Sequence, residues 1–134
     1  MANVTGSAPR PLPRPTDAEL EILTVLWSRG ATTVREVHET IAARKPTQYT
    51  TVLKTLQIMA EKGLVERDER ERAHVYRAAV SQADTERRFV RELSERFFAG
   101  SAAQLALRAL QIEKASDEEL EAIRQLIEKK GVTK

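Results

Sequence analysis

The sequence predicts a mainly α-helical protein with a small β-hairpin wing: a winged helix-turn-helix domain followed by a C-terminal helical dimerisation domain. Three observations lead to this fold class. Three short helical patterns with short connections occupy residues 17–62. Two short strand patterns around a charged stretch follow at residues 64–77, and a helix-turn-helix that continues into a hairpin is the winged form. Residues 81–134 show helical periodicity alone.

The composition excludes several classes of protein. The chain has 134 residues, 31% of them charged, a net charge of +2 and no cysteine, so no disulfide framework or thiolate metal site is expected. No apolar stretch approaches the ~20 residues of a membrane span. No secretion signal is present, so we expect a cytoplasmic protein that does not insert into a lipid membrane. Because no phosphate-binding glycine loop, nucleophile elbow or metal-ligand cluster is present, we expect no enzyme, no cofactor and no metal.

Residues 1–15 are expected to form a disordered arm rich in proline and arginine. Prolines alternate with other residues from Pro9 to Pro15, and proline lacks a backbone donor and favours an extended chain. The arginines of this arm could touch phosphate, although a tail without such a role is the more frequent behaviour of a terminus. The winged-helix domain is then expected over residues 16–80 and the helical domain over residues 81–134.

Capping boxes mark the starts of the first two helices. Thr16 with Glu19, and Thr33 with Glu36, have the spacing at which each side chain bonds the other residue's backbone N–H. The second helix is expected to end before Pro46, because proline disfavours the helical conformation in the residue before it. The apolar side chains at helical spacing are Leu20, Leu23, Leu26 and Trp27 in the first helix, and Val34, Val37 and Ile41 in the second.

The third helix is expected to begin with Thr47 as its N-cap and to end at Gly63. Its predicted core-facing stripe consists of Tyr49, Val52, Leu53, Leu56 and Ala60. The opposite face then presents Thr47, Thr51, Lys54, Thr55, Ile58 and Lys62. Hydroxyls can bond phosphates or base edges, lysine supplies positive charge, and methyl groups can meet thymine methyls, so this face has the chemistry of a recognition helix.

Positive charge is concentrated around this helix. The window from Arg44 to Lys62 holds four bases and one acid, Glu61, whereas the helical pattern at residues 117–130 alternates acids and bases densely. A local basic patch suits a polyanion, so we interpret the face as DNA-binding; the alternative is an ordinary solvated helix face. The residues predicted to contact DNA are Arg44, Lys45, Thr47, Gln48, Thr50, Thr51, Lys54, Thr55, Arg70 and Arg72.

Two of those residues, Arg70 and Arg72, lie in the charged stretch of residues 68–74. If this stretch is a wing, both arginines can reach backbone phosphates or the minor groove. Three acids in the same stretch favour the alternative of a solvent-facing turn whose charges neutralise one another. The residue pattern leaves both interpretations open.

The C-terminal segment is expected to form three helices, the first capped by Ser81 and the last opened by a capping box of Ser116 and Glu119. About 50 residues are too few for a robust core, so their apolar stripes need another surface. Packing on the N-terminal domain is one solution. A second copy fits better, because an inverted-repeat site needs two recognition helices about one turn of DNA apart. The predicted dimer interface consists of Phe89, Leu93, Phe97, Phe98, Leu105, Leu120, Ile123 and Ile127.

Two segments make the chain resemble the penicillinase-repressor family (BlaI/MecI/CopY-like). Residues 16–27, TDAELEILTVLW, resemble the first helix of that family. Residues 49–56, YTTVLKTL, continuing through residues 61–65 into the hairpin that ends at residues 75–77, are similar to a second part of it. The resemblance keeps the same order and spacing from residue 16 to about residue 127.

The resemblance implies a homodimeric transcriptional repressor whose winged helix binds an inverted-repeat DNA operator, with a β-lactam-resistance or stress-response operon as the candidate target. In β-lactam-responsive members a membrane sensor-protease triggers cleavage at an Asn-Phe bond, where this chain has Arg108-Ala109. Copper-responsive relatives carry cysteine pairs, which this chain lacks. The alternative hypothesis is a winged-helix protein-interaction module that does not bind DNA.

Overall fold

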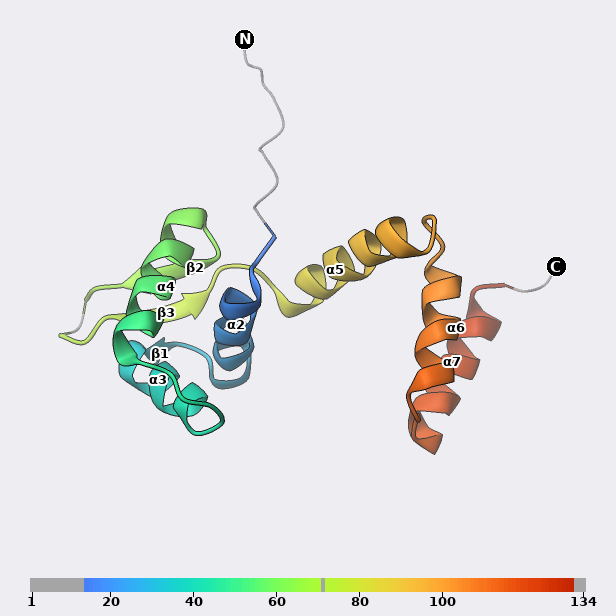
Figure 1. Cartoon of the computed structure of the whole chain (residues 1–134), viewed down its shortest axis with the longest axis horizontal. Helices are drawn as coiled ribbons and strands as arrows, with labels where there is room; N and C mark the ends of the chain where they lie inside the picture. The colour runs from blue at the N-terminus through green and yellow to red at the C-terminus, as the bar shows by residue number, and fades with distance from the viewer. Residues whose placement is uncertain (1–13, 71, 132–134) are drawn as a thin grey trace, which may run out of the picture. The chain divides into compact units, whose positions relative to one another are not determined.

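A computed structural model describes residues 14–70 and 72–131 of the chain (Figure 1). Most of the predicted arm, residues 1–13, and the hairpin residue Glu71 lie outside the described residues. The helices are α2 (Asp17–Arg29), α3 (Val34–Ala42), α4 (Tyr49–Lys62), α5 (Gln82–Phe97), α6 (Ala102–Ile112) and α7 (Asp117–Lys129). The strands are β1 (Thr32–Thr33), β2 (Val65–Asp68) and β3 (Val75–Ala78).

Helices α2, α3 and α4 share one apolar core with the small sheet, which is the winged-helix fold that the sequence predicts. Trp27 packs at the edge of this core, and its indole Nε1 donates a hydrogen bond of 2.9 Å to the Val80 carbonyl. That bond ties the end of α2 to the chain just before α5. The buried core residues are Ile22, Leu23, Val25, Leu26, Val34, Val37, Ile41, Val52, Leu56, Met59, Leu64, Val65 and Tyr76.

The sheet has three antiparallel strands in the order β1-β3-β2. The predicted hairpin is confirmed as β2 and β3, with Val65 opposite Ala78. Strand β1 was not predicted, because a two-residue strand is too short to show alternation. Its Thr32 pairs with Tyr76 and is buried, so β1 covers the edge of β3 that the hairpin leaves open.

Both predicted capping boxes are present at the starts of α2 and α3. In each box the N-cap hydroxyl accepts a hydrogen bond of 3.2 Å from a backbone N–H three residues later, Glu19 to Thr16 and Glu36 to Thr33. Helix α3 ends at Ala42, before Pro46, as the proline predicts. Local sequence signals therefore locate the first two helices.

The predicted start of α4 is wrong by one residue. The N-cap is Gln48, not Thr47, and the Thr47 hydroxyl instead donates to the Lys45 carbonyl at 3.1 Å. A threonine two residues after a free carbonyl can close this local bond in place of capping the helix. The end of α4 is as predicted, because Gly63 takes the left-handed conformation with φ of 86°.

The predicted core stripe of α4 is also corrected, because the helix is rotated about its axis. Its buried residues are Val52, Leu56 and Met59, and the fully buried Met59 was absent from the predicted stripe. Tyr49 is 44% exposed, since the first turn lies at the margin of the core. Leu53 only packs against the edge of the core, as does Ala60. The flexible thioether of Met59 fills a core as well as leucine does, and the predicted stripe omitted it.

Lys62, predicted on the outward face, is held by a carboxylate of another helix. Its Nζ lies 2.7 Å from Oε2 of Glu19, whose side chain is only 4% exposed. The other carboxylate oxygen of Glu19 accepts the Thr16 backbone N–H at 2.9 Å. Burial raises the pKa of Glu19, but the bonds from Lys62 and Thr16 together outweigh it, and the pKa lies below its ordinary value. This pair joins the start of α2 to the end of α4.

The C-terminal helices lack a core of this kind. Contacts divide the chain inside α5, between Thr85 and Glu86. Helices α6 and α7, all of whose residues are described, contain no buried residue. The predicted capping box of Ser116 and Glu119 is nevertheless present at the start of α7. No helix in the described part of the chain is long and apolar enough to cross a membrane.

Candidate nucleic-acid interface

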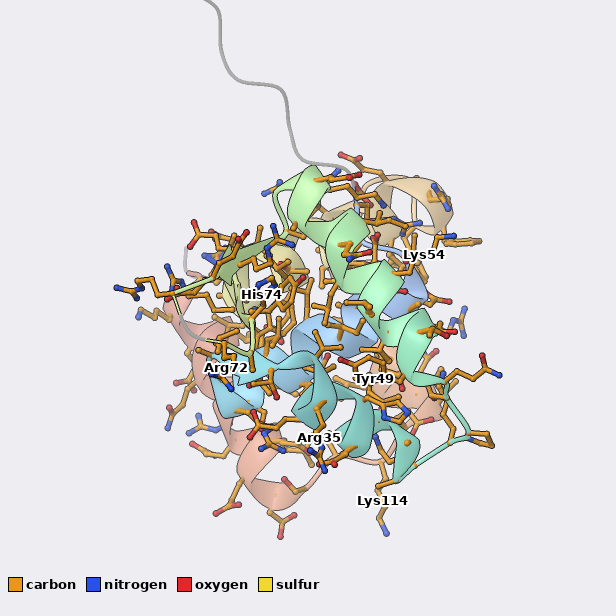
Figure 2. The ribbon with its side chains drawn as sticks, turned by 90° about the vertical axis from the view of Figure 1, so that its left-hand side faces the viewer. Arg35, Tyr49, Lys54, Arg72, His74 and Lys114 are labelled. Atoms are coloured by element: carbon orange, nitrogen blue, oxygen red, sulfur yellow. The ribbon has the colours of Figure 1, made fainter. Side chains whose placement is uncertain are left out.

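The exposed side of α4 carries most of the predicted DNA contacts of that helix, among them Lys54, which Figure 2 labels. Of those residues, Gln48, Thr50, Thr51 and Lys54 are exposed, and the first turn holds no acid. Ile58 is exposed on this side as predicted, and the rotation of the helix also brings the exposed Gln57 and Glu61 to it. The side thus starts with hydroxyls, amide and ammonium groups and ends with a carboxylate.

The N-terminus of α4 differs from those of α2 and α3. Its N-cap, Gln48, makes no side-chain cap bond among the described residues, and the first turn has no acid. The positive end of the helix dipole is therefore not compensated within this turn, which favours an incoming anion. In α2 and α3, by contrast, a glutamate of the capping box already occupies this position.

Two predicted contact residues, Thr47 and Thr55, are half-buried, and their hydroxyl hydrogens are already donated. Thr55 donates to the Thr51 carbonyl at 2.8 Å, and Thr47 to the carbonyl of Lys45. Each hydroxyl oxygen can still accept a hydrogen bond. Toward DNA these two residues therefore offer acceptors and methyl groups, whereas donors must come from their neighbours.

His38 of α3 contacts the turn before α4. Its Nε2 lies 2.7 Å from the Thr47 carbonyl oxygen, and its ring meets that of Tyr49 edge-on, with centroids 5.8 Å apart. One side chain thus contacts both sides of the N-cap. This arrangement fixes the approach of the chain to α4.

Arg44 and Lys45 lie in the turn between α3 and α4, where both pair with Glu21 of α2. The Lys45 Nζ is 3.1 Å from one carboxylate oxygen and an Arg44 guanidinium nitrogen is 3.8 Å from the other. Both basic side chains are more than half exposed. One carboxylate therefore pairs with two cations, so this turn keeps a surplus of positive charge.

In the hairpin, Arg70 is bound to Asp68. Its Nε lies 3.0 and 3.1 Å from the two carboxylate oxygens, and one terminal nitrogen lies 2.6 Å from Oδ2. The Arg70 backbone N–H also donates to Oδ1 at 3.0 Å. The guanidinium first, and this N–H second, hold the pKa of Asp68 far below its ordinary value. Asp68 is therefore ionised at any physiological pH.

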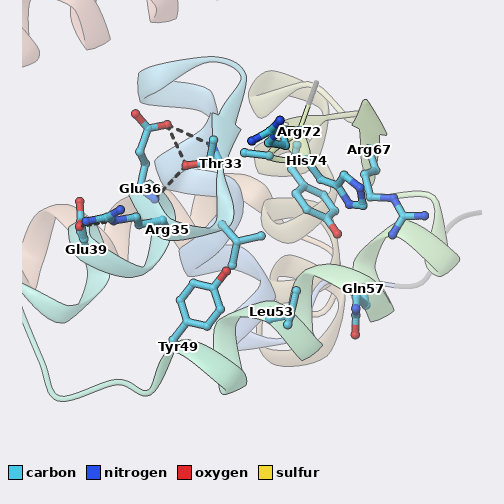
Figure 3. A pocket seen from close by; sticks show the side chains of 13 residues that line it. Thr33, Arg35, Glu36, Glu39, Tyr49, Leu53, Gln57, Arg67, Arg72 and His74 are labelled. Atoms are coloured by element: carbon cyan, nitrogen blue, oxygen red, sulfur yellow. Dashed lines mark hydrogen bonds and ion pairs between the residues drawn. The ribbon is translucent and has the colours of Figure 1, made fainter. Parts of the chain in front are cut away.

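A groove of about 710 Å³ lies between α3, α4 and the hairpin (Figure 3). Helix α4 lines it with Tyr49, Leu53 and Gln57, and the hairpin with Arg67, Arg72 and His74. From α3 come Arg35, Glu36 and Glu39, where Arg35 bonds Glu39 at 3.2 Å. The predicted contact Arg72 thus shares a concave surface with α4.

Sequence reasoning missed Gln57, Arg35, Arg67 and His74 as members of this surface. The usable signal was Met59: with Met59 on the core side, the helical period of about 100° per residue turns Gln57 toward the exposed side. No sequence signal places Arg35 in the same groove as the hairpin residues, since that groove depends on how α3 and the sheet pack.

The predicted dimer-interface residues lie on α5, α6 and α7 and are incompletely covered in the single chain. Phe97 is 68% exposed and Ile127 54% exposed, and both are predicted interface residues. Exposed as well are Leu93 and Leu120, whereas Phe89, Phe98, Leu105 and Ile123 are half-buried. Large contiguous apolar patches on soluble proteins commonly mark interaction sites.

Within residues 14–70 and 72–131, no group of three or more histidine, aspartate or glutamate side chains is arranged to hold a metal ion. What α4 and the hairpin can do is bind: an uncapped helix end, exposed donors and guanidinium groups are the means by which proteins contact nucleic acid.

Residues 15–129 match the family described as Penicillinase repressor. Over 61 residues the chain is 46% identical to "Transcriptional regulator BlaI" of Mycobacterium tuberculosis, and the match covers 45% of this chain and 44% of that protein. The chain therefore aligns with less than half the length of that relative. It is 24% identical over 117 residues to "Penicillinase repressor" of Bacillus licheniformis, covering 87% of this chain and 91% of the relative.

The fold is similar to a solution structure described as the DNA binding domain of the repressor BlaI, with a TM-score of 0.50 and 24% sequence identity. The similarity covers 56% of this chain and 92% of the solved domain. It agrees with the winged-helix arrangement of α2 to α4 and the sheet.

Proposed function

The chain belongs to the penicillinase repressor family, and from this we propose that it is a transcriptional repressor that binds a double-stranded DNA operator through α4. The observation that carries the proposal is the exposed side of α4, where Gln48, Thr50, Thr51 and Lys54 surround an uncapped helix N-terminus. A recognition helix makes its base contacts mainly near its N-terminus.

Each of these groups has a task in the proposed complex. Gln48, Thr50 and Thr51 face base edges in the major groove, and the Lys54 ammonium neutralises phosphate. Thr47 and Thr55 add acceptors and methyl groups at the border of this surface. Arg44, Lys45, Arg70 and Arg72 contact the backbone on both sides, and the first three exchange a carboxylate partner for a phosphate in doing so.

We further propose that the repressor is a homodimer that reads an inverted repeat. Residues 16–80 act as the DNA-binding domain and residues 81–134 as the dimerisation domain. The incompletely covered apolar side chains of α5, α6 and α7 support this, because a second copy would bury them without further elements. A two-fold dimer presents two copies of α4 to two half-sites.

The proposed targets are operons of β-lactam resistance or stress response, and a DNA-binding repressor acts in the cytoplasm. A membrane sensor-protease is a candidate partner by family resemblance alone. Arg108, at the position that corresponds to the family's cleaved bond, lies in α6, and its guanidinium bonds Gln111 at 2.9 Å. Incubation with the cognate protease would show whether this bond is cut.

Selection of bound sequences from a random duplex pool tests the proposal, and the selected sequence is expected to be an inverted repeat. We expect Lys54→Ala to weaken operator binding about tenfold and to reduce the salt slope by about 1. Lys114→Ala is the matched control, because Lys114 is exposed outside α4 and should leave binding unchanged. If Lys54→Ala binds as the parent does, α4 is not the recognition helix.

Thr51→Ala should change which sequence is selected, because one hydroxyl that faces base edges is lost. Thr24→Ala, an exposed helical threonine of α2 whose hydroxyl bonds the Leu20 carbonyl, should select the parent sequence. The alternative function, a protein-interaction module, predicts no selected sequence and no dependence of duplex binding on salt.

A further inference from the structure

The hairpin that is proposed to touch DNA is compensated in charge by its own acids. Arg70 is bound at both carboxylate oxygens of Asp68. Arg67 pairs with Glu69, and Arg77 of β3 pairs with Glu66 of the facing strand at 3.1 Å. These acids would weaken a wing that served only to attract phosphate, because each carboxylate cancels the positive charge of the arginine it pairs with.

The Asp68 carboxylate is held in place by more than the ion pair. It accepts the Arg70 backbone N–H as well as the guanidinium, so it belongs to the turn itself. Its side chain is 25% exposed, whereas that of Arg70 is 85% exposed. If the arginine side chain swings away, the negative charge stays at the base of the hairpin tip.

We propose that Asp68 is a specificity-determining residue: it suppresses binding of the hairpin to DNA that lacks the operator sequence. The proposal rests on the proposed function, DNA binding through α4. In its free state the protein keeps Arg70 on Asp68, and Arg70 transfers to a phosphate only when α4 is seated in its operator.

Asp68 affects the two kinds of complex differently: the non-specific complex, held by long-range attraction, and the docked operator complex, held by direct contacts. Non-specific binding is a long-range electrostatic attraction that depends on net charge within a Debye length, about 8 Å at physiological salt. At that range Arg70 and Asp68 count as neutral. In the docked complex Arg70 touches a phosphate at hydrogen-bond distance, where a charge-assisted bond replaces the Asp68 bond. Asp68 therefore lowers the affinity for non-specific DNA more than it lowers the affinity for the operator.

The test compares Asp68→Asn with the parent on a random duplex and on the selected operator. Asparagine keeps a carbonyl oxygen for the Arg70 N–H and removes the charge. We expect affinity for the random duplex to rise about three- to tenfold and its salt slope to steepen by about 1, while operator affinity rises at most about twofold. The ratio of the two affinities therefore falls.

Glu66→Gln is the matched control. It removes one negative charge from the same hairpin, but Glu66 pairs with Arg77 in the strands, nearer the base of the hairpin than Asp68. It should change the affinity ratio less than Asp68→Asn does. Equal effects of the two variants overturn the proposal, because they would show a general effect of net charge.

Arg70→Gln completes a double-mutant cycle. In the parent it should lower random-duplex affinity, because Asp68 is left without its cation, whereas added to Asp68→Asn it should return that affinity to about the parent value. If the gain survives in the double variant, Asp68 does not act through Arg70 and the proposal fails. A parent that selects no sequence overturns the proposed function, and this inference falls with it. A parent that selects an operator, with an affinity ratio unchanged in Asp68→Asn, overturns this inference alone.

Discussion

The regions before and after the boundary in α5, between Thr85 and Glu86, start their helices with the same local signals but differ in how much they bury. Both α2 and α7 open with complete capping boxes, Thr16 with Glu19 and Ser116 with Glu119. The first region buries apolar side chains from three helices and the sheet in one core. In the second, α6 and α7 contain no buried residue within the described chain. Helix formation is thus a local property, while burial requires a surface from elsewhere.

This difference bears on how each region is stabilised. Isolated helices of 11–13 residues, the lengths of α6 and α7, are marginal in water. Burial of their exposed leucine and isoleucine side chains would provide the missing stabilisation. The first region should therefore unfold independently of protein concentration, and the second should depend on it if a second copy covers those side chains.

The largest expected effect is a loss of stability in the first region, which has its own core. Leu56→Ala removes a side chain with no exposed surface in α4, and we expect the free energy of unfolding of this region to fall by about 3 kcal/mol. Urea denaturation followed by the fluorescence of Trp27, the one tryptophan, measures the loss. Leu107→Ala, on the exposed side of α6, is the control and should leave this transition unchanged. A loss below about 1 kcal/mol would contradict the central place of Leu56 in the core.

The next largest effect is a weaker association of the second region, which lacks such a core. Ile127→Glu places a charge among the exposed apolar side chains of α7 and should raise the dissociation constant of the proposed dimer about a hundredfold. Gln125→Glu adds the same charge on the same helix and should have a far smaller effect. Sedimentation equilibrium measures both. If both variants and the parent have the same oligomeric state, the assigned surface is not the dimer interface.

An intermediate effect concerns the ion pair that closes the first region. Glu19→Gln should lower the free energy of unfolding by about 2 kcal/mol at pH 7, because Lys62 loses its partner in a mostly buried site. The pKa of Glu19 is depressed in the folded state, so its stabilisation is present above the ordinary pKa of 4.5 and is lost as pH falls through the folded pKa.

The pH dependence distinguishes this pair from a simple packing contact. The stability difference between the parent and Glu19→Gln should shrink as the pH is lowered from about 5, when measured by urea denaturation at each pH. Glu39→Gln, which removes an exposed carboxylate of α3, should show a much smaller difference. A difference for Glu19→Gln that is constant from pH 7 to pH 3 would show that its charge does not stabilise the fold.

The smallest effects compare the two capping boxes directly. Thr16→Ala should lower the free energy of unfolding of the first region by about 1 kcal/mol. Ser116→Ala removes the same bond from α7 and should leave that transition unchanged, while lowering the thermal stability of the second region. Thermal unfolding followed by circular dichroism at two protein concentrations distinguishes the transitions of the two regions. Equal effects of both variants on the first transition would mean that the regions unfold as one.

Local signals account for what could be predicted about the fold and the candidate interface. The capping boxes, the end of α3 before Pro46 and the stop at Gly63 depend on a few neighbouring residues, and the structure contains all of them. The exposure of Thr50, Thr51 and Lys54 also agrees with the helical period. The assignment of these residues to DNA stays a proposal.

Apart from the N-cap of α4, where Thr47 bonds the nearby Lys45 carbonyl, the errors of prediction involve partners distant in sequence. The orientation of α4 depends on Met59 reaching the shared core, and β1 exists because Thr32 pairs with Tyr76. Lys62 turns from the outward face toward Glu19, more than forty residues earlier. None of these contacts leaves a periodic trace in the sequence, because each depends on the packing of separate elements.

The sequence by itself determined the order of the helices, the hairpin and, apart from the N-cap of α4, the residues that start and stop them, since those depend on backbone bonds within a single turn. The tertiary structure decided which side of α4 is exposed, which cations already have a carboxylate partner, and which apolar stripes stay uncovered. The physical reason is that burial and charge pairing are properties of surfaces that meet, and only the folded chain brings those surfaces together.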